Sequence, residues 1–251
     1  MESLVPAAGP PVFLVPPGDL PADTVTLTGP EGHHAAVVRR LRPGERADVS
    51  DGAGTLAEGV VTAVARDSVT LAVRAIHAVP PPDPRISVVQ ALPKGDRGEL
   101  AVELMTEVGV DSVIAWSAER CVTRWHGDRG ARALGKWQSA AREAAKQSRR
   151  AWLPALTGPA TLADITKRAA AATQAIVLEA DASARLSTLP LPEHGEILLI
   201  VGPEGGISPA ERTALSAASA VEARLGPTVL RTSTAGAAAA AVLLTRTGRW
   251  N

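Results

Sequence analysis

A proline-rich run at residues 80–84, Pro80-Pro81-Pro82-Asp83-Pro84, divides the sequence into two parts of different texture. Proline fixes the φ angle and has no amide hydrogen, so such a run favours a stiff, extended connection. We therefore expect a linker at residues 80–84 between two domains, one of residues 1–79 and one of residues 85–251.

Before the linker, apolar residues occur in short runs that are typical of β-strands. Asp51-Gly52 is a turn signal between two of these runs, and residues 32–42 have the pattern of one short helix. These features predict a small β-barrel. Its expected strands are residues 25–27, 47–49, 59–61 and 69–73.

After the linker, strand and helix patterns alternate, which favours a mostly parallel α/β sheet. Ser208-Pro209-Ala210-Glu211 is a capping box that marks the start of one helix. Gly109 is suited to end a different helix, the one expected at residues 99–108. The expected strands are residues 86–92, 113–116, 175–178, 197–201 and 221–225, and the other expected helices are residues 99–108, 131–150 and 235–246.

Charge is balanced over the whole chain but concentrated in one segment. The sequence has 26 Lys and Arg against 26 Asp and Glu, whereas residues 120–152 contain nine cations and only the acids Asp128 and Glu143. A segregated basic segment can attract a polyanion although the total charge is zero. A solvated helical face is the alternative interpretation.

Several classes of protein are disfavoured by what the sequence lacks. The single cysteine, Cys121, excludes an intramolecular disulfide, and it is either a nucleophile or, more commonly, a small buried residue. His33 and His34 have no evident third ligand, so we expect no metal ion. The first Lys or Arg is Arg39, and no apolar run is long enough for a membrane helix. We therefore expect a cytoplasmic protein that makes no contact with membranes.

The strongest local signal is an apolar strand at residues 197–201 followed by Gly202-Pro203-Glu204-Gly205-Gly206. Ligands of open α/β sheets bind at the carboxyl ends of strands, and glycines there let the backbone approach a ligand. The loop matches neither the dinucleotide fingerprint nor the Walker loop, and Ser208 already caps the next helix. We therefore expect a ligand without phosphate, although an ordinary strand-to-helix turn would have a similar sequence.

A second loop of the same kind follows the expected strand at residues 221–225. It contains Gly226-Pro227 and leads through Arg231 into the last helix. The hydroxyls of Thr232, Ser233 and Thr234 can cap that helix, whereas Arg231 is a cation next to the expected ligand loop.

The combined motifs closely resemble the family of ribosomal small-subunit RNA uridine-N3 methyltransferases, the RsmE family. The match runs through nearly the whole chain in the right order. Its residues are 199–208, Glu211, Leu225-Gly226-Pro227 and Leu230-Arg231-Thr232; 107–110, 119–121, 143–150 and Pro154; and His34, 38–40, Gly44 and Asp51-Gly52. The family often has Glu where this chain has Lys146 and Ser233, which puts a catalytic role for those two positions in doubt.

The resemblance implies a fold and a chemistry. The fold is an α/β SPOUT domain with a deep trefoil knot, preceded by a PUA-like β-barrel. The activity is methylation of N3 of a uridine in 16S ribosomal RNA of the small subunit, with S-adenosyl-L-methionine as cofactor, and the assembly is a homodimer.

The resemblance also implies site residues. Arg231 is expected to stabilise charge on the uracil, and the base is Glu204, Glu179 or water; Arg231 and Glu204 are our candidate catalytic residues. The expected cofactor-binding residues are Leu178, Glu179, Gly202, Pro203, Glu204, Gly205, Gly206, Ile207, Leu225, Gly226, Leu230, Arg231, Thr232, Ser233, Thr234 and Ala235. The expected RNA-binding residues are His34, Arg40, Lys94, Arg97, Arg120, Arg124, Gln147, Arg149 and Arg150.

Two alternatives stay open from the sequence. One is a SPOUT methyltransferase that acts on transfer RNA, and the other is an RNA-binding homologue without catalysis. A Rossmann-type methyltransferase is disfavoured because its early glycine motif is missing.

Overall fold

The structure, a computed structural model, describes residues 9–250 and forms two compact units. The N-terminal unit comprises the chain up to Pro81 together with Ala145–Leu153, and the C-terminal unit comprises Pro82–Ala144 and the chain from Pro154 onward. Residues 1–8 and 251 of the two expected domains lie outside the described residues.

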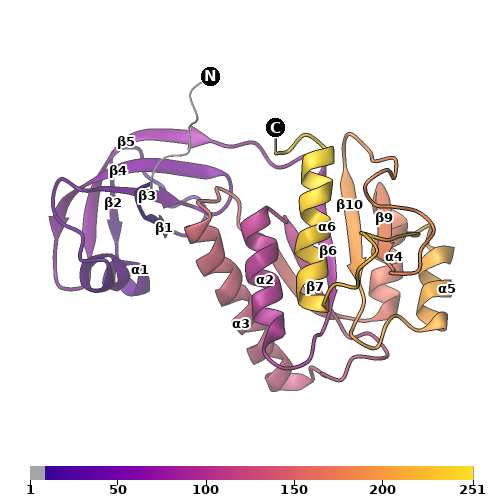
Figure 1. Ribbon diagram of the computed structural model, residues 1–251. Helices are drawn as coiled ribbons and strands as arrows, with labels where there is room; N and C mark the ends of the chain where they lie inside the picture. Colours follow the sequence, from indigo (N-terminus) through magenta and orange to yellow (C-terminus); the bar gives the residue numbers. More distant parts are fainter. Residues whose placement is uncertain (1–8, 251) are drawn as a thin grey trace. The chain divides into compact units, whose positions relative to one another are not determined.

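The N-terminal unit is built on one five-stranded sheet in the order β1-β3-β4-β5-β2 (Figure 1). Neighbouring strands are antiparallel, except that β1 runs parallel to β3. The bounds are β1 (Val12–Leu14), β2 (Thr24–Leu27), β3 (Arg46–Ser50), β4 (Thr55–Val64) and β5 (Val69–Ala78).

Alternating burial along these strands creates the core of the unit, in which Phe13, Leu27 and Leu71 are fully buried. Gly59 is required by packing, because a Cβ there would lie 2.8 Å from the carbonyl oxygen of Ala47. The helix expected at residues 32–42 begins earlier and ends sooner. It consists of α1 (Gly29–His33) and a π-helical turn over His34–Val38.

Ala145–Leu153 packs with the N-terminal unit although it follows the expected domain boundary by many residues. The Lys146 ammonium lies 3.2 Å from Oε1 of Glu31, and the Trp152 indole donates a hydrogen bond of 3.0 Å to the carbonyl of Val79. These contacts join residues more than 70 positions apart, so local sequence patterns do not reveal them.

The C-terminal unit has six parallel strands in the order β11-β9-β10-β6-β7-β8. The strand bounds are β6 (Arg85–Ala91), β7 (Ser112–Trp116), β8 (Ala155–Ala160), β9 (Gln174–Leu178), β10 (Glu196–Val201) and β11 (Val221–Ala223). The helix bounds are α2 (Arg97–Val108), α3 (Gly127–Gln147), α4 (Leu162–Ala171), α5 (Pro209–Ala217) and α6 (Thr232–Arg246).

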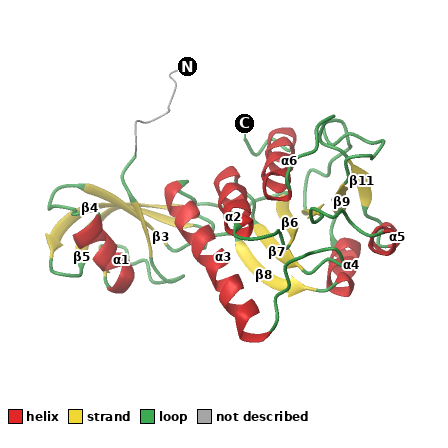
Figure 2. Ribbon diagram, turned by 60° about the horizontal axis from the view of Figure 1, so that its bottom comes forward, coloured by secondary structure: helices red, strands yellow, loops and turns green. Residues whose placement is uncertain are grey.

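Helices cover both faces of this sheet (Figure 2). Helix α6 packs along α2 and over β6 and β10, while α4 contacts α5 and β9. The central strands are accordingly buried without alternation, and Ile197–Ile200 of β10 is fully buried. Among the described residues, no helix is both long and apolar enough to cross a membrane.

Strand β8 and helix α4 were not expected from the sequence. Strand β8 is an edge strand with the helix-breaking pair Gly158-Pro159, so its signal is weak. Helix α4 had a recognisable start, because Thr161 and Asp164 form a capping box.

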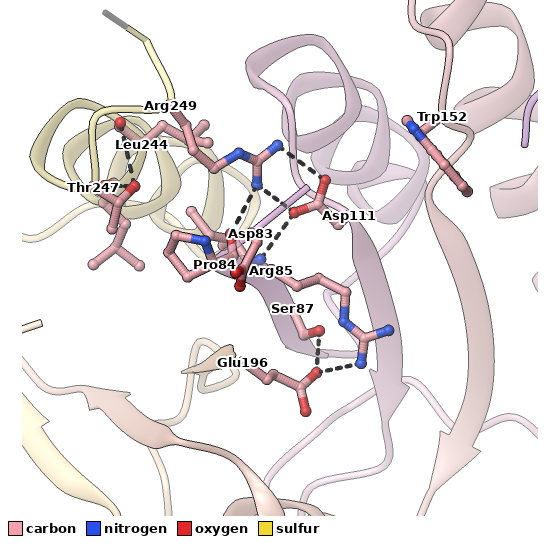
Figure 3. Close-up of polar contacts among 12 residues, drawn as sticks. Asp83, Pro84, Arg85, Ser87, Asp111, Trp152, Glu196, Leu244, Thr247 and Arg249 are labelled. Carbon is pink, nitrogen blue, oxygen red and sulfur yellow. Dashed lines mark hydrogen bonds and ion pairs between the residues drawn. The ribbon is translucent and has the colours of Figure 1, made fainter. Parts of the chain in front are cut away.

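The amino ends of the central strands are tied to the end of the last helix (Figure 3). The Arg249 guanidinium lies 2.5 Å from Oδ2 of Asp111 and donates to the carbonyl of Pro84 at 3.3 Å. Oδ2 of Asp111 also accepts from the amide of Ile86. The opposite, carboxyl edge of the sheet carries the open cavities.

Candidate functional site

A cavity of about 390 Å³ opens at the carboxyl ends of β9, β10 and β11. Loops after all three strands and the first turn of α6 form its walls. It is lined by 13 of the 16 residues expected to bind a cofactor: Leu178, Glu179, Gly202, Pro203, Glu204, Gly206, Ile207, Leu225, Gly226, Leu230, Arg231, Thr232 and Ala235.

The loop after β10 makes a tight turn in which Gly206 lines the cavity and Gly205 does not. Gly206 has a φ of +74° and donates to the carbonyl of Pro203, so the turn needs a residue without a Cβ. Gly205 does not line the cavity. A Cβ on Gly205 would lie 3.2 Å from Cβ of Arg120, whose guanidinium donates to the Gly205 carbonyl at 3.1 Å.

The first turn of α6 separates the hydroxyl residues expected there. Thr232 lines the cavity, whereas Ser233 is buried in the helix packing and Thr234 points to solvent, and neither of these two lines the cavity. Arg231 is the N-cap residue of α6 and lines the cavity. Its exposed guanidinium makes no hydrogen bond or ion pair with any other described residue.

Two carboxylates face the cavity with this single arginine. Burial raises the pKa of Glu179 above its ordinary value, although Arg212 opposes the shift. Glu204 is exposed, and its Oε1 accepts a hydrogen bond of 3.2 Å from the amide of Lys94. Two carboxylates and one guanidinium suit a neutral or cationic ligand better than a phosphate.

Gln90, at the end of β6, supports the first turn of α6 and was not expected at the site. Its side-chain amide donates to the carbonyls of Ala91 and Thr232 at 3.0 and 3.4 Å. The side chain is fully buried, and its Oε1 has no partner among the described residues. Gln90 and Ser87 are the two polar residues in the otherwise apolar run at residues 86–92, and this was the available signal.

Five further residues line the cavity that were not expected to. They flank the expected residues at the strand ends and in the second loop, and most are small or apolar, so their identities carry little signal. They are Ala180, Val201, Ala223, Thr228 and Val229.

The residues expected to bind RNA in the N-terminal unit differ in their exposure and in their contacts with other side chains. The Arg149 guanidinium lies 2.5 Å from Oδ2 of Asp48 and donates to the carbonyl of Pro10. Burial raises the pKa of Asp48, and Arg149 opposes that shift, so this arginine has an internal partner. His34 lies 3.3 Å from the Lys146 ammonium, and Arg40 is exposed. Gln147 is the last residue of α3, and Arg150 follows that helix.

Two of the expected RNA-binding arginines of the C-terminal unit brace its loops. Arg124 donates hydrogen bonds of 2.7 Å to the carbonyls of Ala118 and Glu119. Arg120 donates to Gly205, as described above. Lys94 is exposed and Arg97 is half-buried at the start of α2. An RNA contact by any of these residues stays a prediction.

Neither a metal cluster nor a reactive thiol emerges from the part of the chain that is described. Residues 9–250 contain no group of three His, Cys, Asp or Glu side chains placed to hold a metal. Cys121 is buried, and burial raises the pKa of its thiol, so it is unsuited to be a nucleophile.

Comparison with known proteins identifies the family of this chain. Residues 80–244 match the RNA methyltransferase domain, and residues 27–74 match the RNA methyltransferase PUA domain. The chain is 46% identical over 229 residues to the ribosomal RNA small subunit methyltransferase E of Mycobacterium bovis, covering 90% of this chain and 87% of that protein. The chain belongs to the ribosomal RNA small subunit methyltransferase E family.

Other members of the methyltransferase E family agree in length and fold. The Bacillus subtilis member is 28% identical and covers 85% of this chain and 87% of that protein. The crystal structure of the Neisseria gonorrhoeae member, bound to S-adenosyl methionine, has a TM-score of 0.84 at 26% identity. It covers 95% of this chain and 98% of that one. The expected fold class, an α/β SPOUT domain with a PUA-like β-barrel, is confirmed.

Lys146 and Ser233, the two positions that depart from the pattern expected from the sequence, are both buried. Lys146 pairs with Glu31 inside the N-terminal unit. Ser233 is buried at 4% exposure in the first turn of α6, where an ionised carboxylate would be costly.

Proposed function

We propose that this chain transfers a methyl group from S-adenosyl-L-methionine to N3 of a uridine in 16S ribosomal RNA of the small subunit. The observation that carries the proposal is the cavity at the ends of β9, β10 and β11, which occurs in a chain of the methyltransferase E family. The family member from Neisseria gonorrhoeae was crystallised with S-adenosyl methionine.

The residues present fit this cofactor. The cavity volume lies in the range of small-molecule sites, and its walls include the apolar side chains of Leu178, Ile207 and Leu225. Glycine at position 226 leaves the wall open, since no atom lies within 4 Å of where its Cβ would be. The carboxylates of Glu179 and Glu204 complement a ligand that carries a sulfonium and an ammonium group.

The chain's own residues would position the uracil and accept the proton that its N3 loses. When bound, the cofactor supplies an electrophilic methyl group. The unpaired Arg231 guanidinium would stabilise the negative charge that develops on the uracil when N3 loses its proton. Glu179 is a better candidate for the general base than Glu204, because burial has raised its pKa and so increased its affinity for that proton.

The same proposal includes a homodimer. Val229, on the cavity wall, is 83% exposed, and its neighbour Leu230 is 37% exposed. Adjacent exposed apolar side chains at the lip of a cavity are suited to be covered by another subunit.

The test is nucleoside mass spectrometry of ribosomal RNA from cells that lack the gene. We expect N3-methyluridine to disappear from the 16S RNA and to return with the wild-type gene. A change confined to transfer RNA would contradict the proposed substrate. If the methylated base is lost but the purified chain binds no S-adenosyl-L-methionine by calorimetry, the proposed catalytic role is wrong.

A further inference from the structure

A second cavity, of about 620 Å³, lies within the C-terminal unit. The start of α2, the loop after β7 and the first half of α3 form its walls. It shares none of its lining residues with the first cavity. Its volume is ample for a nucleotide.

This cavity presents both signs of charge. Arg129 and Lys136, about two turns apart on α3, line one wall, and Asp96 and Glu99, at the start of α2, line another. None of these four side chains makes a hydrogen bond or ion pair with another described residue. The cavity therefore offers unpaired cations and unpaired carboxylates to one ligand.

Two tryptophans provide a rigid floor. The rings of Trp125 and Trp137 meet edge to face, with centroids 4.9 Å apart, and they are 9% and 4% exposed. Gly98 lets α2 approach this floor, since a Cβ there would lie 2.5 Å from the indole nitrogen of Trp137. The site is thus preformed by packing in the C-terminal unit.

One hydrogen bond connects the loops that border the two cavities. The amide of Lys94, next to Gly95 of the second cavity, donates to Glu204 of the first. Thr123 of the second cavity donates a hydrogen bond of 2.8 Å to the carbonyl of Pro93. The loops that line the two cavities are therefore in contact.

We propose that the second cavity binds a guanosine of the RNA substrate close in sequence to the methylated uridine. Its phosphate would lie at Arg129 and Lys136, and its base would face Asp96 and Glu99. Carboxylates only accept hydrogen bonds, and guanine presents an N–H and an amino group side by side on one edge, whereas uracil presents a single N–H. The inference rests on the proposed function, because it assumes that the substrate is RNA.

The first experiment compares Lys136→Ala with Arg132→Ala. Both remove one exposed cation from α3, but only Lys136 lines the cavity. A fragment of 16S RNA that contains the methylated uridine is titrated at several salt concentrations. The quantity measured is the slope of log affinity against log salt concentration. For Lys136→Ala, and likewise for Arg129→Ala, we expect its magnitude to fall by about 0.7 on single-stranded RNA, the value for one phosphate contact. The KM for RNA should rise while the affinity for S-adenosyl-L-methionine is unchanged. Equal slopes for Lys136→Ala and Arg132→Ala would overturn the phosphate assignment.

The second experiment tests the base. Fragments in which one guanosine near the uridine is replaced by inosine, which lacks the amino group, should bind wild type about tenfold more weakly at one position. The double variant Asp96→Asn/Glu99→Gln should lose that preference. If no position shows this preference, the cavity does not bind a guanosine of the RNA and the proposal is overturned. If guanosine 5′-monophosphate alone binds as tightly as RNA, the cavity is a site for a free nucleotide and the proposal is likewise overturned. Methyl transfer by wild type, measured in parallel, separates these outcomes from failure of the proposed function.

Discussion

Glycine serves opposite purposes at two positions of the first cavity. At Gly202 a Cβ would lie 2.6 Å from Cγ1 of Ile207, so the absence of a side chain permits close packing inside the loop. At Gly226 no atom lies within 4 Å of a would-be Cβ, so the absence of a side chain leaves space for a ligand. Only the second position allows the cavity to be filled without disturbing the fold.

We therefore predict that Gly226→Val weakens the binding of S-adenosyl-L-methionine by at least about tenfold, because the new side chain would occupy space that the ligand needs. A tenfold loss corresponds to about 1.4 kcal/mol of binding free energy. Calorimetry measures the affinity, and circular dichroism checks that the fold is retained. Gly135→Val is the matched control, because Gly135 on α3 also has open space around its Cβ position but lies outside the cavity. Equal affinities for the two variants would show that the cofactor does not use this wall.

Glu196 is a half-buried carboxylate at the opposite edge of the same sheet. Burial alone would raise its pKa, but the Ser87 hydroxyl and the guanidinium groups of Arg168 and Arg85 together hold the pKa below the ordinary value of 4.5. Figure 3 shows Ser87 and Arg85 converging on this carboxylate. A lowered pKa means that folding favours the ionised form, so the stabilisation is present above the ordinary pKa and is lost as the pH falls through the lowered one.

Glu196→Gln should lower the free energy of unfolding by about 1–3 kcal/mol at neutral pH, because charged hydrogen bonds are lost. The deficit relative to wild type should shrink as the pH falls below the ordinary pKa of the carboxyl. Urea unfolding at several pH values measures both effects. Glu193→Gln, at an exposed position nearby, should have little effect at any pH. A deficit that is independent of pH would assign the role of Glu196 to packing instead.

At the scale of elements, capping signals located two helix ends correctly, whereas the expected helices at residues 131–150 and 235–246 begin earlier, at Gly127 and Thr232. The capping box of Ser208 and Glu211 starts α5, and Gly109, with a φ of +107°, ends α2, as predicted. The structure adds a second role for Glu211. Its other oxygen accepts a hydrogen bond of 2.7 Å from the amide of Glu119, so the cap also holds the loop after β7.

Glu211→Ala should therefore destabilise the protein by more than the loss of one cap. We expect about 2–4 kcal/mol, the sum of a cap and a buried charged hydrogen bond. Asp164→Ala, which removes the equivalent residue of the exposed capping box on α4, should cost only about 1 kcal/mol. Urea unfolding measures both variants. Equal costs would mean that the contact with Glu119 adds nothing to stability.

At the scale of the whole molecule, the proposed dimer has a direct test. Light scattering at micromolar concentration should give twice the mass of one chain. Val229→Asp should shift the protein toward monomers, because it would bury a charge in the interface, whereas Val38→Asp, at 62% exposure in the N-terminal unit, should not. A wild-type monomer would contradict the proposal.

The sequence by itself determined the features whose causes are local. The apolar strand β10, the glycine turn after it and the capped start of α5 were predicted because burial periodicity, turn geometry and capping act over a few residues. The two glycine loops pointed to the carboxyl edge of the sheet, where parallel strands end together and where the first cavity lies. The full set of 16 expected residues came from the family resemblance, and 13 of them line that cavity.

Tertiary structure alone decided what the charged side chains contact. Arg149 is held by Asp48, which is 101 positions away, and Arg120 by the carbonyl of Gly205, which is 85 positions away, so the charge pattern along the chain did not distinguish these arginines from the unpaired Arg129 and Lys136. The second cavity likewise exists only because the start of α2, the loop after β7 and α3 meet. The physical reason is that an ionic or hydrogen-bond partner is chosen by distance in space, which local periodicity does not encode.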